Sequence, residues 1–183
     1  MMTTLKVSFL FLLGVWLTAG AAVAQKSSPS PLRLFINEVQ PGTLSALQYC
    51  TLVFDDHHFH SEKADIKHGQ SSDRKVYEGQ LADADWNSLI AIIDGSPFRD
   101  MKVPQSVPPP VMQDTHPYTI SVARGNDFQN MEFLTSSSMK PYEAEVKPLL
   151  QWWKSFRGRR TPESKASPDS RCTLDSNHAV FSQ

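Results

Sequence analysis

Up to four strand-like segments follow one another in the first half of this chain of 183 residues, and only short connections separate them. The segments are rich in β-branched and aromatic side chains, which favour strands. They cover residues 32–39, 47–54, 59–66 and 74–81. Parallel neighbours need a crossover of a dozen or more residues, and these connections have no room for one. The sequence therefore predicts an antiparallel sheet.

A helix with one apolar face is predicted for residues 83–95. Its large apolar side chains recur at intervals of three and four residues, which places them on one side of a helix. They are Trp86, Leu89, Ile90 and Ile93. Asp83 and Asp85 fall in the first turn, where the helix dipole favours acidic groups.

A second apolar stripe predicts a helix over residues 140–158. Its members are Tyr142, Val146, Leu149, Leu150, Trp153 and Phe156. Pro141 suits a helix start, whereas Pro148 lies inside the pattern. Pro148 is expected either to kink the helix or to mark a second start.

Between the two helices, residues 118–124 and 127–134 are predicted to form a hairpin, because they alternate around a short turn. The preceding residues 96–117 contain six prolines and are expected to be a long surface loop. The order strands, helix, hairpin, helix predicts a small α+β domain. We expect an antiparallel sheet of five to six strands, with both helices packed on one face.

The N-terminus has the pattern of a secretory signal peptide. A lysine at position 6 precedes the apolar run VSFLFLLGVWLTAG, and small residues follow at Ala22 and Ala24. The run is shorter than the roughly 20 residues that a membrane span needs. Cleavage is expected between Ala24 and Gln25, with an uncleaved anchor as the alternative. The mature protein is therefore predicted to be secreted or periplasmic, with no transmembrane segment.

Composition divides the chain into four parts. Residues 1–24 are the expected signal peptide, and residues 25–31 form a Ser/Pro linker. Residues 32–158 contain all the periodic segments and are the expected α+β domain. Residues 159–183 are polar, in the way that is typical of disorder, and form the expected tail.

The side-chain charges of the mature chain nearly balance. The expected signal peptide contains one of the 18 basic side chains and none of the 19 acidic ones. Domains that bind nucleic acid usually show a clear positive excess. The basic cluster at residues 154–160 lies at the end of a predicted helix, where cations complement the dipole. A nucleic-acid partner is not expected.

The chain contains two cysteines, Cys50 and Cys172. An even number of cysteines in an exported protein favours a disulfide. However, Cys50 lies in a predicted strand and Cys172 in the polar tail, so the pairing stays open at this point.

The stretch DDHHFH, residues 55–60, allows two interpretations. In the first, His58 and His60 point the same way from one strand and bind zinc or copper, with Asp56 or Glu62 as a further ligand. In the second, DDHH is the tip of a hairpin, Phe59 faces the core, and both histidines face water. The second is favoured, because it explains Phe59 and both flanking strands and needs no distant ligand.

Partner binding is suggested by Trp152 and Arg157, since exposed tryptophan and arginine are frequent at interaction hot spots. The alternative is a wide apolar face that buries both Trp152 and Trp153. The sequence contains no G-x-S-x-G, no H-E-x-x-H and no glycine-rich phosphate loop.

These observations favour an exported, non-catalytic binding module without a cofactor. Its expected partner is a protein or an envelope component. The alternative is a metal-binding protein that holds zinc or copper in the DDHHFH segment.

The predicted processing can be checked by intact mass spectrometry of the protein purified from a host that exports it. We expect a mature chain that begins at Gln25, because the small residues before it suit signal peptidase. The same mass shows whether both thiols have lost their hydrogen atoms to a disulfide. Membrane-bound protein that retains residues 1–24 would contradict cleavage.

Overall fold

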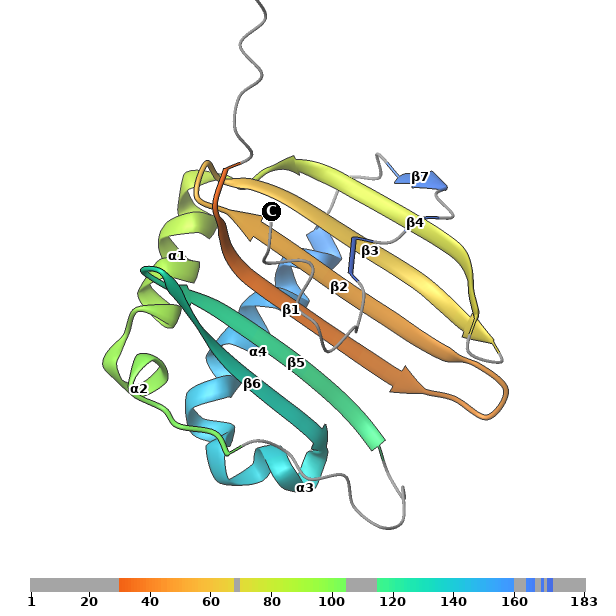
Figure 1. The fold of residues 1–183 in the computed structure, drawn as a ribbon. Coiled ribbons are helices and arrows are strands. Elements are labelled where there is room, and N and C mark those ends of the chain that lie inside the picture. The colour runs from red at the N-terminus through yellow and green to blue at the C-terminus, as the bar shows by residue number, and fades with distance from the viewer. Residues whose placement is uncertain are drawn as a thin grey trace, which may run out of the picture.

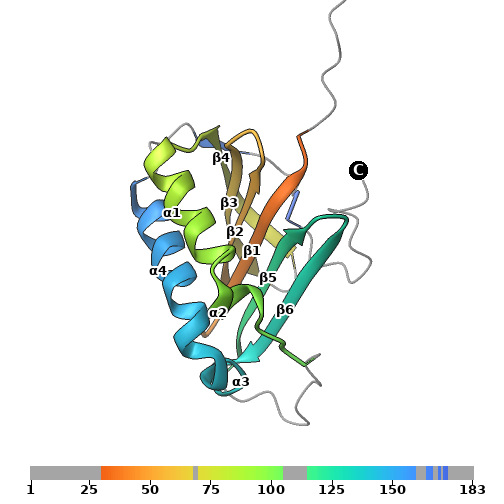
Figure 2. The same cartoon turned by 90° about the vertical axis from the view of Figure 1, so that its left-hand side faces the viewer.

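An antiparallel sheet with helices on one face forms the fold (Figures 1 and 2). The structure is a computed structural model that describes residues 30–67, 70–104, 115–159, 164–166, 169 and 171–172. The expected signal peptide and most of the expected linker and tail lie outside these residues.

The sheet has seven strands in the spatial order β6-β5-β1-β2-β3-β4-β7, and all neighbours are antiparallel. In chain order the strands are β1 (Leu32–Pro41), β2 (Ala46–Phe54), β3 (His58–Lys67), β4 (Gln70–Gln80), β5 (Thr115–Arg124), β6 (Asp127–Thr135) and β7 (Ser164–Ala166). The predicted α+β class and antiparallel sheet are confirmed. The short β7 adds a strand from within the expected polar tail.

The helical elements are α1 (Asp83–Ile93), α2 (Ser96–Arg99), α3 (Ser136–Met139), the 3-10 turn η1 (Lys140–Tyr142) and α4 (Glu143–Arg159). Figure 2 shows α1 and α4 side by side on one face of the sheet, which we call the helix face. None of the described helices is long and apolar enough to cross a membrane.

Pro97 and Pro148 both lie within α-helices of the structure. The segment 96–117 begins with the single-turn helix α2, where Pro97 occupies the first turn and Phe98 is buried. A proline in a first turn costs no hydrogen bond, which explains why the helix forms there. Pro148 lies inside one continuous helix α4 on its exposed side, so it does not mark a second start.

The core between α4 and the sheet is centred on Trp153, whose side chain is 0 % exposed. Its indole Nε1 donates a hydrogen bond of 2.8 Å to Oγ1 of Thr51 on β2. The Thr51 hydroxyl also lies 2.9 Å from the hydroxyl of Ser61 on β3. Satisfying each of these buried polar atoms allows a tryptophan and two hydroxyls to lie in an apolar core.

The opposite face of the sheet, which we call the second face, has a smaller apolar cluster. Its buried members are Phe35, Cys50, Leu52, Phe54 and Cys172. Cys172 is joined there by Arg171, and these two residues, which we call the C-terminal segment, lie over β2 and β3 on this face. The two faces of the sheet are thus covered by different parts of the chain.

Replacing Trp153 with alanine is expected to lower the free energy of unfolding by about 3–5 kcal/mol, because it leaves a cavity and removes the hydrogen bond to Thr51. Urea unfolding followed by circular dichroism measures the change. The adjacent, exposed Lys154 provides the control, since Lys154→Ala should change the stability by no more than about 0.5 kcal/mol. Equal losses in both variants would show that Trp153 is not central to the core.

Candidate functional site

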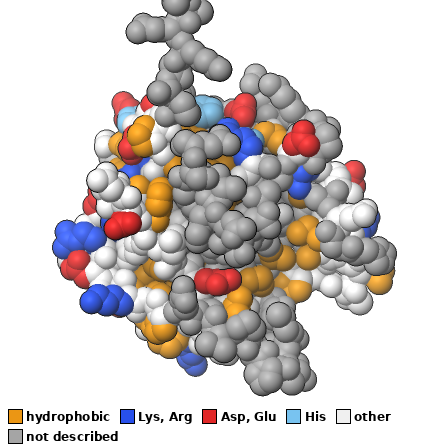
Figure 3. All heavy atoms as spheres, in the orientation of Figure 1, with side chains coloured by type: hydrophobic (Ala, Val, Ile, Leu, Met, Phe, Trp, Pro, Cys, Tyr) orange, Lys and Arg blue, Asp and Glu red, His pale blue; other side chains and the backbone are white. Residues whose placement is uncertain are grey.

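The DDHHFH segment forms the turn between β2 and β3 and the start of β3. Oδ1 of Asp56 accepts a hydrogen bond from the backbone N of His58 at 3.0 Å. His57 has φ of 66° and its carbonyl accepts a hydrogen bond from the backbone N of Leu81, just before α1. Its ring stacks on Trp86 of α1 at 4.3 Å between centroids. The turn is therefore fastened to α1. Figure 3 shows histidine and acidic side chains at this upper edge.

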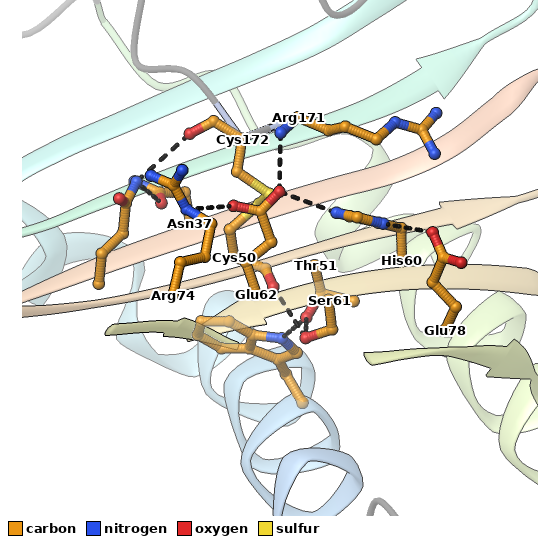
Figure 4. Close-up of a disulfide and its surroundings, with 12 residues drawn as sticks. Asn37, Cys50, Thr51, His60, Ser61, Glu62, Arg74, Glu78, Arg171 and Cys172 are labelled. Atoms are coloured by element: carbon orange, nitrogen blue, oxygen red, sulfur yellow. Dashed lines mark hydrogen bonds and ion pairs between the residues drawn. A yellow bond between two sulfur atoms is a disulfide. The ribbon is translucent and has the colours of Figure 1, made fainter. Parts of the chain in front are cut away.

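Phe59 packs in the main core on the helix face. His60, however, does not face water as the hairpin interpretation expected, because only 3 % of it is exposed. Its side chain points to the second face, where the segment around Arg171 and Cys172 lies over the sheet (Figure 4). A strand pattern shows that two side chains share a face, but not what covers that face.

His60 lies between two carboxylates (Figure 4). Its Nε2 is 2.8 Å from Oε1 of Glu62 on the same strand, and its Nδ1 is 3.0 Å from Oε1 of Glu78 on β4. Glu62 is itself buried and has further partners. Nε of Arg74 lies 3.3 Å from its Oε2, and the backbone N of Arg171 donates to its Oε1 at 2.7 Å. We call His60, Glu62, Arg74 and Glu78 the ion cluster.

Of the four expected metal ligands, the structure brings together only His60 and Glu62. Asp56 is exposed, and the His58 ring lies 5.6 Å from Phe54. Among the described residues, no group of three potential metal ligands includes Asp56 or His58. The group that does form consists of His60, Glu62 and Cys172.

Cys50 and Cys172 form a disulfide beside the ion cluster (Figure 4). Their Cα atoms are 6.0 Å apart, across 122 positions of sequence. The pairing that the sequence left open is therefore present in the structure. It attaches the C-terminal segment to the middle of the sheet, and Gln48 adds a hydrogen bond of 3.4 Å to the Cys172 carbonyl. In the chain-entropy model, a loop of this length stabilises the fold by about 4–5 kcal/mol.

Trp152 is not the exposed anchor that the partner-binding hypothesis requires, because it is 7 % exposed. Its Nε1 donates to the Asp85 carbonyl at 3.1 Å, and its ring stacks on Phe156 at 5.5 Å. The wide buried face, which was the alternative, is what α4 presents to α1 and the sheet. Arg157 also points inward. Its Cζ lies 4.1 Å from the ring centroid of Tyr49 and 4.0 Å from that of Trp153.

Arg157 is part of a buried group of side chains that was not predicted from the sequence. We call this group, which consists of Glu38, His116, Tyr118 and Arg157, the Glu38 centre. Nη1 of Arg157 lies 2.8 Å from Oε2 of Glu38, a β1 side chain that is 0 % exposed. Oε1 of Glu38 accepts a very short hydrogen bond from the Tyr118 hydroxyl and lies 3.0 Å from Nε2 of His116. Glu38 occupies an inward position of a strand otherwise filled by Leu34 and Ile36. An acid at an inward position of an apolar strand was the signal in the sequence that could have indicated a buried charge.

The Glu38 centre has the electrostatics of a structural ion pair. Burial raises the pKa of Glu38 and is the largest single effect, but hydrogen bonds from Tyr118 and Gln40 and the charge of Arg157 together outweigh it. The pKa of Glu38 is therefore below its ordinary value. Burial, and then the contact with Glu38, raise the pKa of Tyr118. Both values move away from neutral pH, whereas a general acid or base works best with a pKa near it.

A groove of about 550 Å³ runs along the outer side of α4, beside α3 and η1. Its apolar floor includes Val146 and Leu150, which are buried, and Met139, which is half-buried. Its exposed lining residues are Ser136, Ser137, Lys140, Glu143, Lys147, Gln151 and Lys154. The sequence does contain a sign of this groove, because Lys140, Lys147 and Lys154 recur every seven residues. That spacing was overlooked beside the apolar stripe of the same segment. We call this feature the α4 groove.

The three places differ in what they offer chemically. The Glu38 centre holds a fixed charge pair, the ion cluster and disulfide lie under the C-terminal segment, and the α4 groove is open to a ligand. No protein-family model matches this chain, and no curated protein matches it either.

Replacing Glu38 with glutamine is expected to lower the free energy of unfolding by about 3–5 kcal/mol near pH 7, because Arg157 loses its buried counter-charge. The pKa of Glu38 is lower in the folded than in the unfolded state. The Glu38 carboxylate therefore stabilises the fold fully above the ordinary glutamate pKa of about 4.3. This stabilisation is lost as the pH falls through the pKa that Glu38 has in the folded protein. The difference between wild type and Glu38→Gln should therefore narrow from about pH 5 to about pH 3.

Urea unfolding over this pH range measures the effect. The exposed Glu143 provides the control, because Glu143→Gln should change the stability by no more than about 0.5 kcal/mol over this range. A difference between wild type and Glu38→Gln that stays constant down to about pH 3 would contradict a stabilising Glu38 carboxylate.

Proposed function

We propose that this protein is an exported, non-catalytic binding domain of the periplasm or cell exterior, and that the α4 groove holds an acidic, amphipathic segment of its partner. The observation that carries the proposal is the groove itself, with an apolar floor between exposed lysines. The partner is a protein or an envelope component that presents such a segment.

The arrangement of charges favours an acidic ligand. Lys147 and Lys154 are two helical turns apart, so they lie on the same side of α4 at a spacing of roughly 10 Å. Lys140 precedes them in η1 and extends the row. Glu143 is the one acid in the lining, so the rim keeps a net positive charge. Carboxylates on a ligand would meet the lysines while its apolar side chains cover the floor.

Non-catalytic function is supported by the chemistry of the groove. Its lining, as far as the structure describes it, contains two serines but no histidine that could activate a hydroxyl as a nucleophile. Binding of a peptide segment needs neither such a base nor a cofactor. The His-containing groups of the described residues lie elsewhere, at the β2–β3 turn, in the ion cluster and at the Glu38 centre.

Export is supported by two independent features. The N-terminal sequence has the pattern of a signal peptide. The Cys50–Cys172 disulfide is a bond that persists in oxidising compartments and is rare where thiols are kept reduced.

The binding proposal is tested with a fluorescent 14-residue peptide of glutamate and leucine that forms an acidic amphipathic helix of roughly 20 Å, the span of the lysine row. We expect it to bind the wild-type protein in fluorescence anisotropy, and more weakly as salt is raised. The triple variant Lys140→Glu, Lys147→Glu, Lys154→Glu should bind it at least about tenfold more weakly, since three ion pairs of about 0.2–1 kcal/mol become repulsions.

The matched control reverses three exposed lysines outside the groove, Lys67, Lys75 and Lys102. It changes the net charge by the same amount and should lower the affinity by less than about threefold. Equal weakening in both triple variants, or equal binding of a lysine–leucine peptide of the same length, would show that the groove is not the site.

A further inference from the structure

We propose that reduction of the Cys50–Cys172 disulfide creates a zinc site, with Cys50, Cys172, His60 and Glu62 as its four ligands. The site lies on the second face of the sheet, away from the α4 groove, so it is independent of the peptide-binding function. It differs from the site suggested by the DDHHFH pattern, since it uses neither Asp56 nor His58.

Position is the first argument. The potential ligand atoms of His60, Glu62 and Cys172 lie within 4.8 Å of one another, and all three residues are buried. Sγ of Cys50 is bonded to Sγ of Cys172, so it lies beside these three ligand atoms. Cys50 and Glu62 are register partners on β2 and β3, which places both on one face of the sheet. Two sulfurs, a nitrogen and an oxygen are ligand atoms that zinc binds in proteins.

The orientation of His60 is the second argument. Its Nδ1 faces Oε1 of Glu78 at 3.0 Å, while its Nε2 faces Glu62 at 2.8 Å (Figure 4). A histidine that binds zinc through one nitrogen usually donates the other N–H to a carboxylate, which fixes the ring and its tautomer. Glu78 is a positioning residue of this kind.

Charge balance is the third argument. Two thiolates and the Glu62 carboxylate carry three negative charges, and zinc supplies two positive ones. The guanidinium of Arg74, whose Nε lies 3.3 Å from Glu62, supplies the third. The Glu78 carboxylate is not part of this sum, because its side chain is 47 % exposed and water solvates its charge. Buried charge that is neutralised within the cluster avoids most of the desolvation cost of an isolated ion.

The redox step determines when the site exists. A dithiol reductant attacks the protein disulfide, gives its two electrons and two protons to the two sulfurs, and becomes a disulfide itself. The two protein thiols then lose their protons as zinc binds. While the disulfide is intact its sulfurs are not thiolates, so the disulfide and the zinc site exclude each other.

The chain allows the sulfurs to separate around a metal. Cys50 is held in the middle of β2, whereas Cys172 lies outside any helix or strand. Movement of the C-terminal segment alone can therefore open the space between the sulfurs, and the positions of His60, Glu62 and Glu78 in the sheet need not change.

The test uses the mature protein in three forms: oxidised, reduced with dithiothreitol and freed of it under argon, and the Cys50→Ser, Cys172→Ser variant. Each form is titrated with Zn²⁺ and followed by native mass spectrometry. Co²⁺ then serves as a spectroscopic probe. We expect one metal ion per reduced wild-type chain, with the thiolate-to-cobalt band and the intense visible bands of tetrahedral cobalt, and no such bands in the other two forms.

In the reduced protein, His60→Gln and Glu62→Gln should each weaken Co²⁺ binding at least about tenfold. His58→Gln is the matched control, since His58 is on the same strand but outside the cluster, and it should bind as wild type does. Equal binding by oxidised and reduced protein, octahedral cobalt bands, or equal weakening by His58→Gln would overturn the proposal.

Two further measurements exclude a result caused by unfolding. Zinc should slow reoxidation of the thiols by oxidised glutathione at least about tenfold, because the two states compete for the same sulfurs. Tryptophan fluorescence should show the native, buried Trp153 in the zinc-loaded reduced protein. A reduced protein that unfolds and that zinc does not refold would also overturn the proposal.

Discussion

The packing of α4 against the sheet is the interaction on which the rest of the structure depends. Trp153 fills the space between them and hydrogen-bonds to Thr51, while Val146 and Leu149 are buried on the same side. This contact fixes the rotation of α4 about its axis. As a result Arg157 turns inward to Glu38, and the lysines turn outward to form the rim of the α4 groove.

The second face follows a different principle. An antiparallel sheet can leave one face in water, and polar side chains are normal there. Here the disulfide draws the C-terminal segment over that face, so His60 and Glu62 become buried. Buried charged groups need partners, and Arg74, Glu78 and the backbone N of Arg171 supply them. A bond between two distant cysteines thus changes a solvated polar strand into a buried cluster of paired polar and charged side chains.

Much of the fold could be predicted because its signals are local. Periods of two and of three to four residues identified the strands and both long helices, and short connections determined that the strands run antiparallel. The errors arose where context overrides a local rule. The six prolines of residues 96–117 were expected to prevent any helix there. Pro97, however, lies in the first turn of α2, where its missing N–H costs no hydrogen bond. The candidate sites were predicted less well than the fold. The buried Glu38, for example, was not predicted as part of a site, because it meets His116 and Tyr118 only through the pairing of β1 with β5.

By itself the sequence determined the six long strands and the two long helices, the antiparallel sheet, the two apolar helix faces and the near-balance of charge, because each depends on neighbours within a few turns or on composition. Only the tertiary structure decided that Cys50 pairs with Cys172, that Trp152 is buried, and that His60 meets Glu62 and Glu78 under the C-terminal segment. The physical reason is that alternation along a strand specifies which side chains share a face. What lies over that face is decided by segments far away in the chain, whose arrival leaves no periodic mark on the strand.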